Sequence, residues 1–209
     1  HAFWNSLKIT LYFSVVSVII QIILGTLTAL LLNQNFKGRG FVRGIILIPW
    51  AVPTIVNANL WKWIFNANAG VLNKVLLKLH LIDENIVWLG SGKLAINMII
   101  LSDTWKMLPL VIIMLLAGLQ TVSNDAKEAS IIAGANAWQR FRFITLPLLQ
   151  PALASSIIYN LIGGLKRYDV IIALTDGGPA KKTHSLATYI ANRYFDADRA
   201  GYAAAIGVF

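Results

Sequence analysis

Residues 9–36 contain no charged side chain, and this run constrains the fold more than any other feature of the sequence. An α-helix needs about 20 apolar residues to cross the hydrocarbon core of a bilayer, so the run is long enough. A bilayer offers no partner to backbone N–H and C=O groups, which leaves only helices and closed barrels as spanning structures. Because the run does not alternate polar with apolar positions, it predicts a membrane-spanning helix.

Further apolar segments predict additional spans over residues 44–61, 94–119 and 143–175, and another begins near Ala200 and is cut off. Pro49 and Pro53 should kink or unwind the helix of the first of these spans. Hydrophobic residues make up 57% of the chain and charged residues only 13%. Soluble domains carry about 25% charged residues. We therefore expect an all-α fold, a polytopic transmembrane helical bundle that forms a single domain over residues 1–209 with about five spans visible.

Two features of composition narrow the function classes. The net charge is +9, but Lys and Arg are spread between the apolar segments, which favours contact with anionic membrane lipid and no nucleic acid. The chain has no cysteine, and His1, His80 and His184 are too scattered to ligate a metal. We expect no metal site and no disulfide.

Polar connections separate the spans, at residues 33–43, 65–93, 120–146 and 176–199. Cytoplasmic loops usually carry more Lys and Arg. The first and third connections hold six such residues and the other two hold seven, so the count does not orient the chain. Their density in the short first connection favours the cytoplasmic side for that loop. The sequence Asp-Gly-Gly-Pro at residues 176–179 predicts a turn.

Residues 120–151 predict two short helices joined by a bend rather than a span. Gly134 permits the bend, and Pro147 and Pro151 begin the next span. This segment resembles the cytoplasmic EAA loop of ATP-binding-cassette importer permeases, which reads Glu-Ala-Ala, three residues, Gly, nine residues, then Ile-x-Leu-Pro. All the spacings match, and Ser130 replaces the second Ala. The matching residues are Glu128, Ala129, Ser130, Gly134, Ile144, Leu146 and Pro147.

The resemblance extends to the stretches IPWAVP, WKWIF, TWKMLP and LTDGGPA, and together these look like the maltose-type subgroup of sugar permeases. It implies the maltose-type permease fold, a bacterial cytoplasmic (inner) membrane location and import of a sugar. It implies a cytoplasmic coupling loop at residues 120–147, and alternation then makes residues 65–93 extracytoplasmic. The implied partners are two nucleotide-binding ATPase subunits, a second homologous permease and an extracytoplasmic solute-binding protein.

The chain contains no GxxxxGK[ST] phosphate-binding loop, so we expect no cofactor in it and no enzyme activity of its own. ATP and Mg²⁺ would bind to the partner subunits. In the family the EAA loop fits a cleft of the ATPase subunit and transmits its closure to the spans. Glu128 is expected to contact that partner, and Gly134 to allow the turn.

Ionisable residues inside a span are costly and usually face the bundle interior or water. The resemblance puts substrate contacts on the helices before and after the EAA loop, which suggests a path lined by Asp103, Lys106, Leu110, Asn160, Gly164 and Arg167. Lys106 and Arg167 favour an acidic saccharide over a neutral one. Alternatively, Asp103 with Lys106 and Arg167 with Asp169 neutralise each other as structural pairs.

Two other functions remain open at this point. An ion-coupled secondary transporter would use Asp103, Lys106 and Asp169 for coupling and need no ATPase. An intramembrane enzyme would need a nucleophile with its base, or a metal cluster, and the sequence offers neither.

Overall fold

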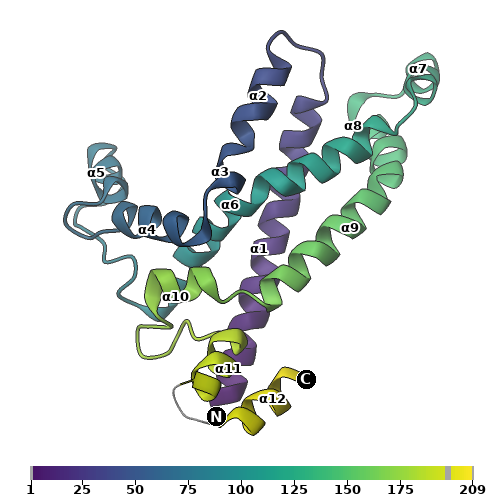
Figure 1. Ribbon diagram of the computed structural model, residues 1–209. Helices are drawn as coiled ribbons and strands as arrows, with labels where there is room; N and C mark the ends of the chain where they lie inside the picture. The colour runs from purple at the N-terminus through teal and green to yellow at the C-terminus, as the bar shows by residue number, and fades with distance from the viewer. Residues whose placement is uncertain (1, 196–198, 209) are drawn as a thin grey trace. The chain divides into compact units, whose positions relative to one another are not determined.

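The computed structural model describes residues 2–195 and 199–208, apart from the side chains of residues 124–127. Its described residues form helices and no β-strand, which confirms the all-α prediction (Figure 1). In chain order the elements are α1 (Ala2–Leu32), α2 (Arg39–Ile46), α3 (Ile48–Ala51), α4 (Thr54–Ile64), α5 (Val71–Lys78), α6 (Gly92–Gln120), α7 (Asn124–Ile132), α8 (Ala137–Arg140), the π-helix η1 (Phe141–Thr145), α9 (Leu146–Leu165), α10 (Asp169–Thr175), α11 (Leu186–Phe195) and α12 (Ala200–Val208).

Three helical stretches are long and apolar enough to cross a membrane: α1, α6 and the continuous run Ala137–Leu165. The segments Arg39–Ala51 and Thr54–Ile64 pass the same test together, but they meet at an angle of 92°. The break falls at Pro53, which has no N–H to donate and an extended ψ of 141°. The bend predicted from the two prolines is therefore confirmed.

The span predicted over residues 143–175 differs from the structure in its boundaries. Residues 143–175 do not form one helix, because α9 ends at Leu165 and α10 starts separately at Asp169. The N–H of Arg167 donates to the carbonyl of Gly164, three residues earlier, which closes the end of the helix with a turn of the 3₁₀ type. The final helix, α12, begins at Ala200 as predicted and has nine residues.

The chain divides into two compact units, and the three long helices contribute to both. The unit of residues 18–51 and 105–161 has an apolar core where one end of α1 packs with α6 and α9. The largest side chains of this core are fully buried, as expected for close-packed membrane helices. Its members are Ala29, Leu32, Val111, Ile112, Leu115, Leu116, Leu119 and Leu149.

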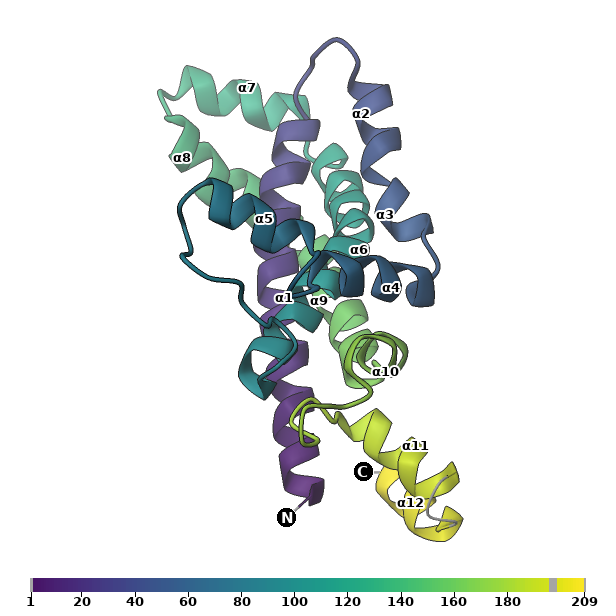
Figure 2. The same ribbon diagram turned by 90° about the vertical axis from the view of Figure 1, so that its left-hand side faces the viewer.

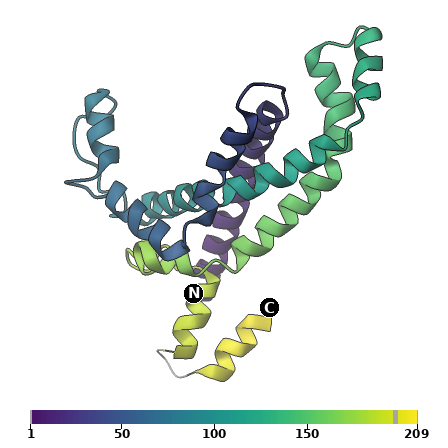
Figure 3. The ribbon, with the colours of Figure 1, turned by 45° about the horizontal axis from the view of Figure 1, so that its top comes forward.

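The other unit consists of residues 1–17, 52–104 and 162–209. Within it, α10 lies beside α4 (Figure 3). The Lys62 ammonium of α4 lies 3.5 Å from the carbonyl of Ala173 in α10, and the Asn57 amide donates to the Ser102 hydroxyl of α6 at 3.1 Å. The helix after the Pro53 break is thus held on two sides by side chains.

The connection at residues 65–93 is organised around one buried amide. The Nδ2 group of Asn73 donates to the carbonyls of Ala67 and Ile86, each at 2.9 Å. Its Oδ1 accepts from the backbone N–H of Ile86 at 3.3 Å and from the indole N–H of Trp88 at 2.9 Å. One side chain on α5 therefore fixes both ends of the connection.

Replacement of Asn73 by Ala is expected to destabilise this unit, because it leaves buried backbone groups and an indole N–H without partners. We expect a loss of about 1–3 kcal/mol in the free energy of unfolding and a change in Trp88 fluorescence before the main transition. Thermal unfolding of the purified protein measures both. Asn68→Ala, which removes an exposed side chain in the same connection, is the matched control. Equal midpoints for the two variants would contradict this role of Asn73.

Candidate functional site

The segment predicted as a coupling loop does form two short helices, α7 and α8, joined at residues 133–136 (Figure 2). Gly134 has a φ of 77°, a left-handed conformation that costs a residue with a Cβ about 1–2 kcal/mol. Its N–H donates to the Ile131 carbonyl, and the N–H of Ala135 donates to the Ser130 carbonyl, both at 2.9 Å. These bonds close the end of α7 as glycine caps commonly do.

The second short helix continues directly into α9. Asn136 and Gln139 form a reciprocal capping box at its start, and the Arg140 guanidinium donates to the Ala135 carbonyl at 2.8 Å. The residues Ile144, Leu146 and Pro147 then lie in η1 and the first turn of α9. A rigid helical connection therefore runs from the bend at Gly134 into a candidate span.

Large apolar side chains are exposed on α7, α8 and η1, among exposed polar residues such as Glu128 and Gln139, and we call them the apolar patch. Ile132 is 88% exposed, and Ile131, Trp138 and Phe143 are exposed as well. Glu128 and Ala129 are also exposed, whereas Ser130 is buried. An apolar patch of this kind marks a site of contact with a protein or a membrane.

Of the residues predicted to line a substrate path, Asp103 and Arg167 come together. The Arg167 Nε atom lies 3.0 Å from Asp103 Oδ1, in an ion pair that lacks the straight N–H···O geometry of a hydrogen bond. The side chains are 18% and 3% exposed, respectively. The alternative interpretation of the sequence paired Arg167 with Asp169. The observed ion pair instead joins Arg167, which follows α9, to Asp103 of α6.

Lys106 and Leu110 lie further along α6, one and two turns beyond Asp103. The buried ammonium of Lys106 donates to the carbonyl of Trp50 at 3.3 Å. This carbonyl belongs to α3, just before the chain breaks at Pro53, where no continuing helix supplies an N–H. A cation at the carboxyl end of a helix is favourable. Leu110 is half-buried.

Asn160 and Gly164 lie one turn apart on α9. The amide of Asn160 is buried and donates to the Ser156 carbonyl at 2.8 Å, but its Oδ1 has no hydrogen-bond partner among the described residues. Gly164 lies against α1, where a Cβ would come within 2.8 Å of the Ser14 hydroxyl. Ser14 therefore fills the space that the missing side chain leaves.

A polar face of α1 escaped the sequence analysis. It consists of Ser6, Thr10, Ser14, Ser17 and Gln21, all of them buried. Their spacing of four, four, three and four residues puts them on one side of the helix. The signal was present in the sequence, as a polar residue at every third or fourth position of an apolar run.

The turn predicted at residues 176–179 is confirmed. Asp176 and Gly177 both have a positive φ, of 50° and 74°. The His184 ring packs where a Cβ of Gly177 would stand, 2.5 Å from its Cδ2 atom. Burial lowers the pKa of His184 from its usual 6.5, and the nearby Lys181 ammonium lowers it further.

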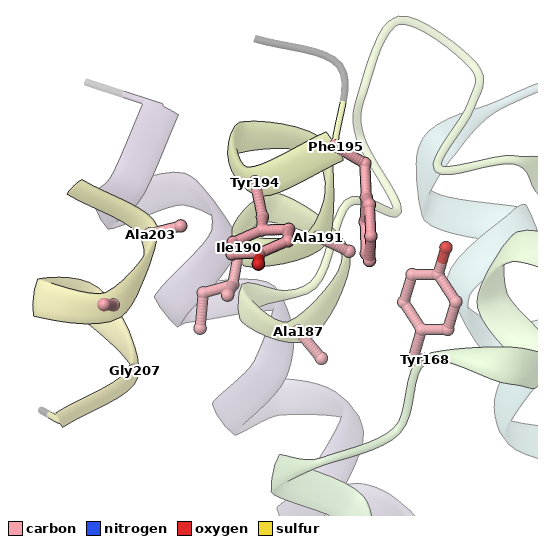
Figure 4. A pocket seen from close by; sticks show the side chains of 9 residues that line it. Tyr168, Ala187, Ile190, Ala191, Tyr194, Phe195, Ala203 and Gly207 are labelled. Atoms are coloured by element: carbon pink, nitrogen blue, oxygen red, sulfur yellow. The ribbon is translucent and has the colours of Figure 1, made fainter. Parts of the chain in front are cut away.

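Two hollows flank α11. One, of about 530 Å³, is lined almost wholly by apolar groups of α11 and α12, and Figure 4 shows Tyr168, Tyr194 and Phe195 around it. The other, of about 420 Å³, is polar and is lined in part by Asp176 and Lys181. Among the described residues no group of three His, Asp or Glu side chains could hold a metal ion.

Comparison with known proteins identifies the family. Residues 21–209 match the family described as binding-protein-dependent transport system inner membrane component. The chain belongs to this family. Its members are transport components, which agrees with the expectation that the chain is not an enzyme and does not favour an ion-coupled transporter.

Relatives and a solved structure cover nearly the whole chain. The trehalose/maltose transport system permease protein MalF of Thermococcus litoralis is 42% identical over 99% of this chain and 69% of its own length. The sulfoquinovosyl glycerol transport system permease protein SmoG of Agrobacterium fabrum is 36% identical over 98% of this chain and 65% of its own. A bacterial ABC transporter involved in the import of the acidic polysaccharide alginate aligns with a TM-score of 0.88 and 26% identity, over all of this chain and 73% of its own. The predicted permease fold is confirmed.

Replacement of Asp103 by Ala is expected to destabilise the protein by up to about 3 kcal/mol, because it leaves the partly buried Arg167 guanidinium without its counter-charge. The double variant Asp103→Asn with Arg167→Gln removes both charges and should recover most of that loss. Chemical unfolding of the purified protein in detergent measures each variant. Additive losses in the double variant would contradict the ion pair.

Proposed function

We propose that this chain is one permease half of an ATP-driven, binding-protein-dependent sugar importer of the bacterial cytoplasmic membrane. The observation that carries this proposal is the exposed apolar patch on α7 and α8, next to the bend at Gly134. The sequence has no phosphate-binding loop, so an ATP-driven importer of this kind would take its energy from ATPase partners. This patch is where such a partner, an ATPase subunit, would bind.

The proposed coupling is mechanical. The ATPase subunit binds α7 in a surface cleft, with Glu128 at the contact and the small side chain of Ala129 allowing close approach. Closure of two ATPase subunits around ATP and Mg²⁺ would move the short helices as a rigid body. Because α8, η1 and α9 form one continuous stretch, Ala137–Leu165, this motion would pass directly along the helix.

The topology follows from this assignment. If residues 120–147 are cytoplasmic, then residues 33–43 are on the same side, and residues 65–93 and 176–199 are extracytoplasmic. An extracytoplasmic solute-binding protein would deliver cargo on that side, and a second homologous permease would complete the path. A structural neighbour solved with an alginate pentasaccharide-bound periplasmic protein supports such an assembly.

The proposed cargo is a sugar, since relatives carry the names of trehalose/maltose and sulfoquinovosyl glycerol systems. The path would be lined by Asp103, Lys106 and Leu110 on α6, and by residues of α9 and its carboxyl end, namely Asn160, Gly164 and Arg167. An acidic saccharide is the finer proposal, because Arg167 retains N–H donors beyond the Nε that faces Asp103.

Replacement of Glu128 by Ala is expected to uncouple transport. In cells that contain all the subunits, sugar uptake should fall at least about tenfold, as for the loss of a contact worth 1.4 kcal/mol. Co-purification of the ATPase subunits should fall with it, while the thermal midpoint of the permease stays unchanged because Glu128 is exposed.

Lys37→Ala is the matched control for Glu128, since it removes an exposed charge from the other connection assigned to the cytoplasmic side. It should leave both uptake and assembly intact. Unchanged coupling in the Glu128 variant would count against the proposed loop and favour an energy source other than ATPase subunits.

The acidic cargo is tested with Asp103→Asn combined with Arg167→Gln, which avoids stranding a buried charge. If the guanidinium binds a carboxylate, uptake of an alginate oligosaccharide should be lost and uptake of maltose or trehalose retained. Competition between the labelled sugars measures this in one assay. Equal loss of both classes, or no change in either, would refute the acidic preference.

A further inference from the structure

The polar face of α1 contains side chains that lack protein partners. Ser14, Ser17 and Gln21 are 0%, 3% and 2% exposed. The hydroxyl oxygens of the two serines and the Oε1 atom of Gln21 have no hydrogen-bond partner among the described residues. A buried polar atom without a partner costs about 1–3 kcal/mol, and a bilayer offers it none.

Another residue on this face of α1, Thr10, does form hydrogen bonds with its side chain. The Thr10 hydroxyl donates to the Ser6 carbonyl at 2.9 Å and accepts the N–H of Leu186 at 2.7 Å. Thr10 therefore has a structural role, as it holds the start of α11. Ser14, one turn further along, packs against Gly164 but its hydroxyl forms no hydrogen bond among the described residues, so packing alone leaves its polar group unsatisfied.

Ser14 connects this face to the proposed substrate path. Its side chain lies in contact with Gly164, so closely that a Cβ there would come within 3.1 Å of the Ser14 Cβ. Three residues beyond Gly164, Arg167 reaches Asp103. The hydroxyl of Thr104, next to Asp103, is also buried and has no partner among the described residues. Unpaired neutral hydroxyls thus occur on α1, where Ser14 contacts Gly164, and on α6, at the residue that follows Asp103.

The chemistry of these groups defines their ligand. Hydroxyls and a side-chain amide both donate and accept hydrogen bonds and carry no charge, which matches the hydroxyl groups of a saccharide. We propose that Ser14, Ser17 and Gln21 form a third wall of the sugar path, which hydrogen-bonds the hydroxyl groups of the cargo when the path opens. This inference rests on the proposed function, and it adds a helix outside the pair that flanks the coupling segment.

The test is a triple variant, Ser14→Ala, Ser17→Ala and Gln21→Met, in the complete transporter with its partner subunits. The uptake assay uses whichever of maltose, trehalose or alginate oligosaccharide the wild type imports. We expect KM to rise about tenfold, as for the loss of one or two hydrogen bonds to the cargo. The thermal midpoint should stay the same or rise, because unpaired buried polar atoms are removed.

Thr10→Val is the matched control on the same face. It removes two formed hydrogen bonds, so it should lower the thermal midpoint and leave KM unchanged. An unchanged KM in the triple variant, or a fall in its thermal midpoint together with uptake, would overturn the proposal while the proposed function stands. If the wild type takes up none of the three sugars, both the proposed function and this inference are overturned.

Discussion

The bilayer's inability to hydrogen-bond a polar group determines most of what is unusual in this structure. Near the break at Pro53, side chains from other elements bond to backbone carbonyls. Lys106 donates to the Trp50 carbonyl just before the Pro53 break. Lys62 reaches the carbonyl of Ala173 on the far side of the same break. Side-chain hydrogen bonds thus stabilise the chain on both sides of the bend after α3.

The same constraint applies to charged groups, as the ion pair of Asp103 and Arg167 shows. Either residue alone would be costly in a buried position, and pairing lowers that cost without removing it. The pair lies just beyond the end of α9 at Leu165, where Arg167 reaches Asp103 of α6.

Local sequence features predicted the helices well, because apolar runs and glycine or proline breaks act over a few residues. The span at residues 9–36, the bend at Pro53, the turn at Gly134 and the start of α12 were all visible in this way. The break between α9 and α10 was not, because apolar residues continue beyond it, and the partner of Arg167 there, Asp103, lies 64 positions away in the sequence. The polar face of α1 was hidden for a different reason. Hydropathy averaged over a span dilutes five small polar residues among many apolar ones.

The continuity of the run from α8 to α9 decides what kind of coupling the chain can support. A flexible linker after Gly134 would absorb a displacement, whereas helical hydrogen bonds from Ala137 to Leu165 transmit it. The single irregular element in this run is η1, and π-helical turns of this kind occur mostly at functional sites. η1 contains Ile144 and directly precedes Leu146 and Pro147. The last residues that match the EAA pattern therefore lie where the helix changes from π to α geometry. Under the proposed function, a displacement of α7 and α8 would therefore reach α9 through η1.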